Sequence, residues 1–332
     1  MLQLFMKKSP TKYDPPPRRR PPPIVQAAYV PAEATQLFAD PLQRCLQLER
    51  FGYLLANRRK WKDHPDCHNV CTTAREQLDE MFAIVPEGFV SLPQVISDAP
   101  GCEEVTIETE PFLLARHPIT NAKYQKFVDA GGYQQLELWP KEIWPHLIDF
   151  KDATDYHGPR HWQHGRHCKP QSDHPVVGVC FYEAAAYARW AGFRLPTEAE
   201  WQMAATWRIR SVANVLRRYP WGDALDINRC NIWSTGRKQT APVHEYPDGA
   251  APNQVLQLVG NVWEWTACNF EVSDDEGGTV LSDMRMSSIR GGAFDTYFPM
   301  QATGVFRTGL VSLAREHNVG FRCAMDVRKP KK

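Results

Sequence analysis

The sequence has no run of about 20 consecutive apolar residues, the length that a helix needs to cross a bilayer, so we expect no membrane-spanning segment. It also has no excess of charge, because 39 basic residues face 38 acidic ones for a formal net charge of +1. No overall field therefore favours nucleic acid or an anionic membrane as a partner. Residues 1–23 lack the order of charged, apolar and cleavable regions that marks a signal peptide, and we expect a cytoplasmic protein.

Disulfide bonds are not expected either. The nine cysteines are an odd number, and without a signal peptide they favour reduced thiols over a disulfide framework. A free cysteine is commonly a small buried apolar residue. That is our expectation for Cys180, Cys268 and Cys323.

The composition along the chain predicts three parts. Residues 1–33 are rich in Pro and Arg, with PPPRRRPPP at Pro15–Pro23, which cannot form a helix or an interior strand. We expect a disordered tail there, with docking into an aromatic groove as the alternative. Apolar residues recur at helical spacing over residues 34–85, which predicts a small helical adaptor segment. Residues 86–328 form the main domain.

The main domain mixes strand and helix patterns, so its predicted class is α+β. A long irregular insertion, rich in Trp, Pro and His, separates its two halves. The predicted elements are strands at 88–92 and within 105–120, a helix over 121–130, the insertion over 138–173, a buried strand at 175–180, and helices over 182–191 and from Pro196 onward.

Several segments rich in Trp and Gly follow in a fixed order: GFRLPTEAEW at Gly192–Trp201, LVGNVWEW at Leu258–Trp265, IRGGAF at Ile289–Phe294 and NVGFRCA at Asn318–Ala324. Together with PFLLARHPITNAKYQKFV, HPVVGV, YPWGD and CNIW, they resemble the formylglycine-generating-enzyme family, the sulfatase-modifying factors. The resemblance covers residues 86–326. It implies an irregular α+β fold related to the C-type lectins.

Most of these signature residues have a structural explanation. A domain with little regular secondary structure must satisfy its loop backbone through side chains, and Arg, Asn and Glu can each make several hydrogen bonds. Tryptophans supply large buried area. We expect these roles for Arg194, Glu198, Glu200, Arg290, Arg307 and Arg322, and for Trp190, Trp201, Trp221, Trp263 and Trp265.

The resemblance also implies Ca²⁺, which prefers oxygen ligands. One site would use the side chains of Gln257 and Glu264 and the carbonyls of Gly260 and Val262. The family usually has Asn or Asp in place of this glutamine. A weaker second site would begin with Asn231 and the Ile232 carbonyl, but the following loop, SerThrGlyArgLysGlnThr, offers no carboxylate. We expect one Ca²⁺ site at most.

One departure from the family concerns its chemistry. The oxidase members bind copper(I) through two cysteines, and soft thiolates suit that metal. Those positions correspond here to Thr296 and Gln301, and neither can be a thiolate ligand. A further family cysteine corresponds to Ala188, which leaves its usual partner, Cys323, as a free thiol. We therefore expect no copper and no formylglycine-generating activity.

A related branch, the ergothioneine-type sulfoxide synthases, joins this fold to an iron-binding helical bundle with a His-x3-His-x-Glu pattern. Here His64 and His68 match the histidine spacing, but Pro65 interrupts the helix and Val70 stands in the carboxylate position. Iron or zinc there, with the nearby Cys67 and Cys71, remains an alternative to surface histidines. A second group of candidate ligands is His157, His161, His164, His167, Cys168 and His174, which could equally be ordinary loop residues.

The segment after the Arg-Gly-Gly is the candidate recognition surface, because loops on a rigid scaffold commonly carry binding. Phe294, Tyr297, Phe298, Met300 and Phe306 form an interaction patch if exposed, or core if they point inward. The resemblance places a ligand groove near Trp221, Trp263, Asp295, Thr296, Tyr297, Gln301 and Arg307.

Three functions remain open. The first is a cysteine-depleted scaffold that binds a protein or peptide ligand, with residues 1–85 joining a larger assembly. The second is an oxygen-dependent metal oxidoreductase of the same superfamily. The third is a variable binding protein of the kind that diversity-generating retroelements encode, which diversifies this part of the fold.

Overall fold

The structure of the chain, a computed structural model, describes residues 40–93, 104–207, 217–270, 272–273, 279–280 and 284–327. All of these described residues belong to one compact unit. The predicted Pro/Arg-rich tail, residues 1–33, lies outside the described residues, as do residues 34–39 of the predicted helical segment. In the described part of the chain, no helix is long and apolar enough to cross a membrane.

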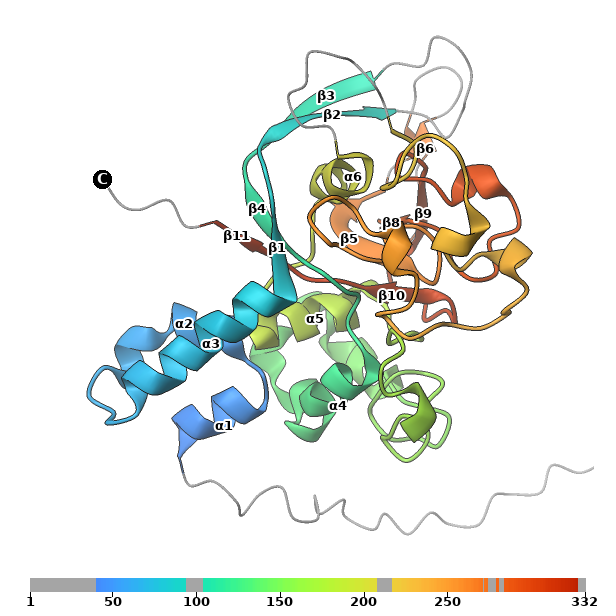
Figure 1. The fold of residues 1–332 in the computed structure, drawn as a ribbon. Helices are drawn as coiled ribbons and strands as arrows, with labels where there is room; N and C mark the ends of the chain where they lie inside the picture. Colours follow the sequence, from blue (N-terminus) through green and yellow to red (C-terminus); the bar gives the residue numbers. More distant parts are fainter. Residues whose placement is uncertain are drawn as a thin grey trace, which may run out of the picture. The chain divides into compact units, whose positions relative to one another are not determined.

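The helices are short, and α6 lies apart from the others, among the strands (Figure 1). Their bounds are α1 (Pro41–Gln47), α2 (Phe51–Ala56), α3 (Cys67–Met81), α4 (Asn121–Asp129), α5 (Phe181–Ala191) and α6 (Glu198–Thr206). The chain also has short 3-10 helices, among them η1 (Arg58–Trp61), η4 (Lys141–Asp149), η7 (Trp233–Thr235) and η9 (Pro299–Gln301). The predicted helices over 121–130, over 182–191 and after Pro196 are confirmed as α4, α5 and α6.

The predicted helical segment is divided into α1 and α2 at Glu49, whose backbone adopts a positive φ of 56°. Asp40 caps α1, because its side chain accepts a hydrogen bond of 2.9 Å from the backbone N–H of Leu42. Leu42 and Leu54 are fully buried and belong to the same hydrophobic core as Trp190 of α5. These helices therefore share the core of the residues that follow them.

The strands form two main sheets. Their bounds are β1 (Phe82–Val85), β2 (Gly88–Pro93), β3 (Glu104–Thr109), β4 (Phe112–Ala115), β5 (Trp263–Asn269), β6 (Val272–Ser273), β7 (Thr279–Val280), β8 (Met286–Arg290), β9 (Arg307–Val311), β10 (Val319–Phe321) and β11 (Ala324–Asp326). One sheet has the order β1-β4-β11 and the other β10-β5-β8-β9, in which only β10 and β5 run parallel. The pairs β2–β3 and β6–β7 stand separately.

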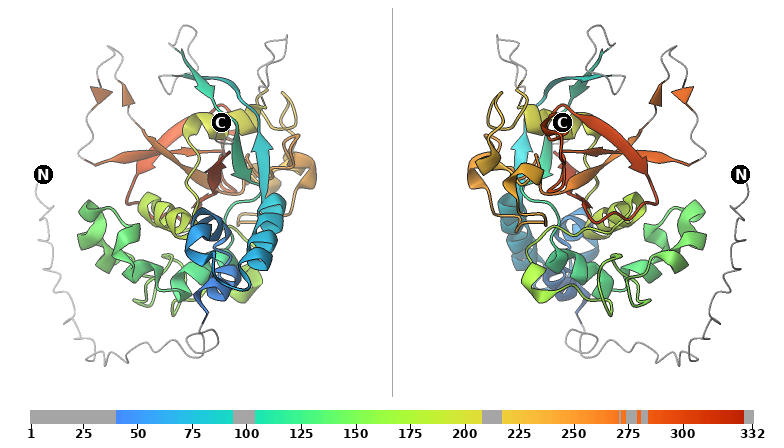
Figure 2. Two further views of the ribbon diagram at one scale, coloured as in Figure 1. Left: turned by 90° about the vertical axis from the view of Figure 1, so that its left-hand side faces the viewer. Right: turned by 90° about the vertical axis from the view of Figure 1, so that its right-hand side faces the viewer.

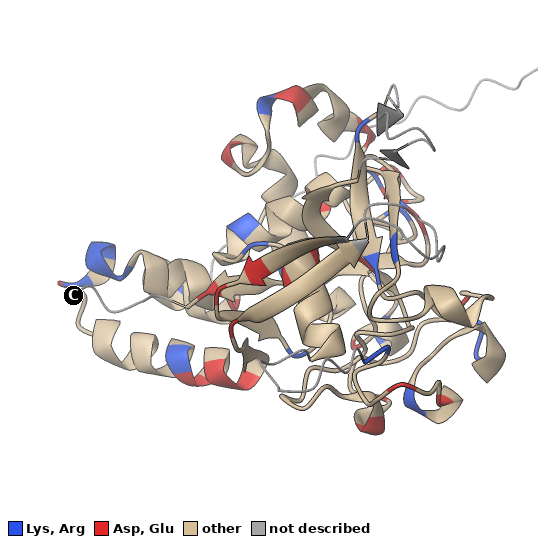
Figure 3. Cartoon of the chain, turned by 90° about the horizontal axis from the view of Figure 1, so that it is seen from above, with Lys and Arg blue, Asp and Glu red and all other residues tan. Residues whose placement is uncertain are grey.

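Both views in Figure 2 show the strands gathered on one side, with α1 to α5 on the other. Strand β1 leads directly from α3 into the first sheet, where its four residues pair with β4. The predicted boundary between residues 85 and 86 remains a prediction. Basic and acidic residues are interspersed over the described ribbon in Figure 3, in line with the near-zero net charge.

The buried strand predicted at residues 175–180 is not found. Val176 and Val179 are fully buried as expected, but only Pro175 makes a bridge, with Thr120. The reason is Gly178, which adopts a φ of 74° and donates its N–H to the carbonyl of Glu316 at 2.8 Å. A residue in the left-handed region cannot continue a strand ladder, so this segment is a buried loop.

The signature side chains hold the loops together as predicted. Arg322 is fully buried and pairs with Glu264 at 2.6 Å and 2.7 Å, and it also donates to the carbonyls of Ala115 and Leu256. Glu198 accepts hydrogen bonds from the guanidiniums of Arg290 and Arg307. The Arg322 guanidinium thus satisfies backbone carbonyls from two distant segments together with a buried carboxylate.

Candidate ligand-binding site

The two positions of the family cysteines fall in a tight turn and the short helix after it. Thr296 is buried, and its hydroxyl accepts a 2.8 Å hydrogen bond from the backbone N–H of Ala293, which closes the turn. Gln301 ends η9 and is half-buried. The hydroxyl of Thr296 closes the turn, and neither Thr296 nor Gln301 can supply a thiolate to copper.

Between these positions the chain presents large apolar side chains to solvent. Tyr297, Phe298 and Met300 are 66%, 57% and 62% exposed, and Trp233 of η7 is 45% exposed. The rings of Tyr297 and Phe298 meet edge to face at 5.3 Å, and Trp233 lies 6.2 Å from Tyr297. These four residues are called the aromatic surface below.

Two aromatic residues that the sequence grouped with this surface point inward instead. Phe294 is only 7% exposed, and Phe306 is half-buried against Trp263 at a ring distance of 6.1 Å. The sequence left open whether these apolar residues are exposed or belong to the core, and the segment contains both kinds. Residues 297–300 are exposed, and the flanking rings pack inward.

The other residues of the predicted groove are engaged inside the fold. Trp221 stacks on Tyr219 at 5.2 Å, with 14° between the ring planes. Arg307 is held by the carboxylate of Glu198 at 2.9 Å and 3.1 Å. Asp295 accepts hydrogen bonds from the amide of Asn318 and lies 3.1 Å from the imidazole of His317. Of the seven predicted groove residues, only Tyr297 is largely exposed.

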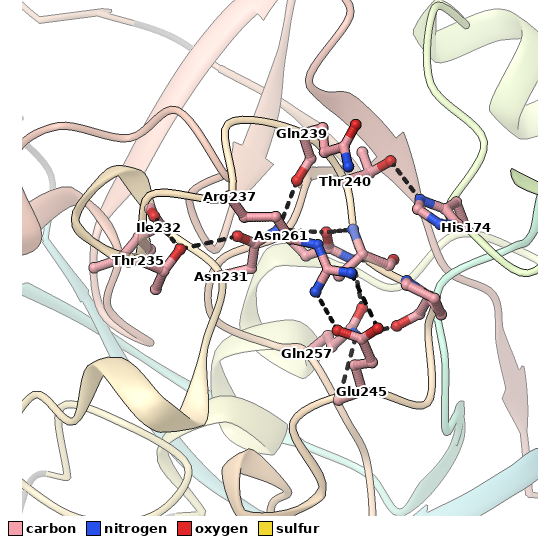
Figure 4. Close-up of polar contacts among 12 residues, drawn as sticks. His174, Asn231, Ile232, Thr235, Arg237, Gln239, Thr240, Glu245, Gln257 and Asn261 are labelled. Carbon is pink, nitrogen blue, oxygen red and sulfur yellow. Dashed lines mark hydrogen bonds and ion pairs between the residues drawn. The ribbon is translucent and has the colours of Figure 1, made fainter.

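The side chains of the two predicted calcium ligands Gln257 and Glu264 are engaged in separate sets of hydrogen bonds, of which Figure 4 shows that of Gln257. The Gln257 amide oxygen accepts a 2.6 Å bond from Asn261, and its nitrogen donates to the carbonyls of Pro242 and Glu245. Both oxygens of Glu264 bind Arg322, and one also accepts from the indole of Trp201 at 2.8 Å.

This donor set does not fit Ca²⁺ as arranged. A guanidinium already supplies the positive charge that Glu264 needs, and the oxygen of Gln257 is occupied. The backbone carbonyls of Gly260 and Val262 alone would be a poor set for a cation that takes six to eight oxygens. A titration must test the calcium site implied by the sequence, and these contacts lead us to expect no binding.

The weaker predicted site is also occupied by internal contacts. The side-chain oxygen of Asn231 and the carbonyl of Ile232 both accept hydrogen bonds from the hydroxyl of Thr235 (Figure 4). In the same loop, Arg237 forms a two-pronged ion pair with Glu245. This loop therefore carries the cation Arg237, whereas the second calcium site implied by the resemblance requires a carboxylate in this loop.

The histidines do not converge on a metal. In the described ranges, only Asp40, His64 and Asp66 bring three potential ligand atoms within 4.8 Å of one another. There, His64 lies 3.2 Å from the Asp40 carboxylate through Nε2, and its Nδ1 accepts from the backbone of Asp66. Since both ring nitrogens are engaged, these residues do not fit iron or zinc as arranged, and His68 is not among them.

The second histidine group lies around a pocket of about 630 Å³. His161, His164, His167, His317, Arg166 and Lys238 line it, together with the apolar residues Trp162, Pro175, Val177 and Phe294. His157 is elsewhere, stacked on Tyr133 at 5.4 Å. Burial is the first cause that lowers the pKa of His161 and of His167, and a neighbouring arginine lowers each further. This space is called the histidine pocket below.

The sequence grouped three of the pocket's four histidines, His161, His164 and His167, but predicted neither His317 nor the pocket. Lys238, Gln239 and Thr240 also line the pocket, although they are some 70 residues along the chain from its histidine loop. A hydrogen bond of 2.9 Å between Thr240 and His174 joins the two segments. No local pattern marks such a pairing. The same loop begins at Trp233, so the pocket and the aromatic surface share one segment.

The chain is similar in sequence and fold to several known proteins. The sequence model of the sulfatase-modifying factor enzyme 1-like domain matches residues 68–327. A hercynine oxygenase of Mycolicibacterium smegmatis is 37% identical over 168 residues, which are 48% of this chain and 38% of that protein. This chain thus covers well under half the length of that relative.

Two further relatives are covered over most of their length. A formylglycine-generating enzyme of Streptomyces coelicolor is 32% identical over 67% of this chain and 80% of its own. A Mus musculus protein, inactive C-alpha-formylglycine-generating enzyme 2, is 30% identical over 69% of this chain and 79% of its own. Among solved structures, PvdO from Pseudomonas aeruginosa has a TM-score of 0.51 at 20% identity, over 74% of this chain and 94% of that one. The predicted α+β fold class is confirmed.

Proposed function

We propose the function of this chain from one premise: it belongs to the family of sulfatase-modifying factor enzyme 1-like domains. Within that family it is a protein- or peptide-binding module that generates no formylglycine. The observation that carries the proposal is the aromatic surface, of which Tyr297, Phe298 and Met300 lie in the segment where oxidase members keep their cysteines.

The exposed side chains favour a protein partner. Aromatic residues and methionine are enriched in the cores of protein interfaces, and large apolar groups gathered on a surface are costly to leave in water. The two segments that carry the aromatic surface are joined directly, since the backbone N–H of Trp233 donates to the carbonyl of Thr296 at 3.3 Å.

The family includes relatives with different activities. One relative above is named a formylglycine-generating enzyme and another an inactive one. The second name supports the view that this fold can be kept without the activity. The eight cysteines in the described residues are all free, which supports a reducing compartment, and a cytoplasmic location is part of the proposal.

The test is capture of partners from the native host with the full-length chain. The double variant Tyr297→Ser with Phe298→Ser should lose the specific partner. The matched control is Trp144→Ser with Ile148→Ser, which removes two exposed apolar side chains, 41% and 66% exposed, from η4. Equal capture by wild type and both variants would refute a binding role of the aromatic surface.

An oxygen-dependent metal oxidoreductase is the second candidate. It is supported by the 37% identity to a hercynine oxygenase and by the cluster of Asp40, His64 and Asp66. The occupied ring nitrogens of His64 count against it. Iron or zinc at a whole-number ratio to the purified protein, with oxygen consumption on thiol substrates, would favour this candidate over the binding module.

A further inference from the structure

The histidine pocket differs from the neighbouring surface in its charge. None of its sixteen lining residues in the described structure is an Asp or a Glu, whereas Arg166 and Lys238 are cations and four are histidines. A second hollow that shares His161 is lined by Asp149, Asp152, Asp155 and Glu316. Carboxylates are therefore common nearby but are excluded from the pocket.

Part of the positive charge is already balanced. Arg166 pairs with Asp129 at 3.1 Å, and His317 pairs with Asp295 at the same distance. Lys238 is exposed and has no salt bridge to any described residue. Its ammonium lies 5.9 Å from the ring of Trp233, a position at the border between the pocket and the aromatic surface.

His167 is held in place by its neighbours, because its two ring nitrogens contact Gln125 and Ser172, each at 3.0 Å. The Gln125 amide donates its nitrogen to Asp129 and to the carbonyl of Gly165, so its oxygen faces Nδ1 of His167 at 3.0 Å. That nitrogen must therefore donate. His161 has no hydrogen bond to a described residue, which leaves its ring available to a ligand.

The apolar walls limit what else can fit. Trp162 and Phe294 are largely buried and contribute to the pocket, as do Pro175 and Val177. A volume of about 630 Å³ falls within the range of small-molecule sites. We propose that the histidine pocket binds a small organic anion, an apolar or aromatic body that carries a carboxylate or a phosphate. The pocket borders the aromatic surface but shares no lining residue with it, and this proposal does not depend on the protein-binding proposal.

The experiment is a calorimetric titration of the full-length chain at neutral pH with three probes: benzoate, phenyl phosphate and benzyl alcohol. The three share one ring and differ in the group it bears, so benzoate and phenyl phosphate distinguish a carboxylate from a phosphate. The two anions should bind and the neutral alcohol should not. Lys238→Glu should weaken the tighter anion about tenfold, since a nearby repulsive charge replaces an attractive one.

Lys60→Glu is the matched control, because Lys60 is an exposed lysine of η1 that does not line the pocket. It should bind the anions as wild type does. The variant Tyr297→Ser with Phe298→Ser should also keep anion binding, which separates this result from the protein-binding test. The proposal is overturned if none of the probes binds, if the alcohol binds as tightly as the anions, or if both lysine variants have the same effect.

Discussion

Replacing Glu198 with Gln tests whether the family signature is structural here. Glu198 is 3% exposed, and one of its oxygens accepts from Arg290 at 2.8 Å and from Arg307 at 2.9 Å. Its other oxygen accepts from Arg307 at 3.1 Å. Gln has the same shape but no charge, and its amide N–H₂ would face a guanidinium donor.

The expected cost follows from burial. Arg290 is fully buried, and burial lowers its pKa while Glu198 raises it, so the carboxylate is the group that makes its charge tolerable. Removing one partner of a buried ion pair costs about 3–5 kcal/mol, because the other charge is left uncompensated. We expect Glu198→Gln to lower the free energy of unfolding by about that amount.

The assay is urea unfolding followed by tryptophan fluorescence, with Asp226→Asn as the control. Asp226 pairs with Arg229 on the surface at 3.0 Å, and both side chains are about 40% exposed. Exposed pairs contribute about 0–1 kcal/mol. Equal unfolding free energies for Glu198→Gln and Asp226→Asn would refute the structural role assigned to the buried signature residues.

Three further predictions follow from the structure. Chelated protein titrated with Ca²⁺ should show neither heat nor a thermal shift, because Glu264 is already paired with Arg322; a saturable heat would restore the calcium prediction. Burial, and next the charge of Arg322, lowers the pKa of His117 from 6.5 to about 4 in the folded protein. Between about pH 6.5 and 4 the histidine is therefore protonated in the unfolded chain but not in the folded one, and the free energy of unfolding falls as the pH is lowered through this range. The total loss is roughly 3 kcal/mol, and His117→Gln should flatten the pH profile of urea unfolding relative to wild type; an unchanged slope would contradict this assignment. Gly260→Ala should destabilise the fold by more than about 1 kcal/mol in the same assay, because Gly260 has a φ of 77° and a Cβ there would lie 2.6 Å from the carbonyl oxygen of Asn231; wild-type stability would show that the loop can shift.

The fold was largely predictable from the sequence because its signatures are also its structural contacts. Arg322 and Glu264 stand in two of the recognised segments, and the structure joins them in one buried ion pair. Helix patterns predicted α4, α5 and α6, because the capping residues and the apolar spacing of a helix lie within its own sequence. The segment 175–180 was misread because buried valines suggest a strand, while the positive φ of Gly178 depends on a distant hydrogen bond.

The candidate site was less predictable. Tyr297 and Phe298 are exposed and Phe294 is buried within one short run, and apolarity alone cannot distinguish them. The histidine pocket requires Lys238 to meet the loop of residues 161–168, and this long-range pairing leaves no periodic signal in the sequence.

The copper-dependent oxidation of a peptide cysteine tests the central claim most directly. A peptide with the Cys-x-Pro-x-Arg pattern is incubated with the copper(I)-loaded protein in air and then analysed by mass spectrometry. With Thr296 and Gln301 in place of the two cysteines, the peptide cysteine should remain unchanged. An aldehyde that forms only when this protein is present would contradict the claim that the scaffold has lost this activity.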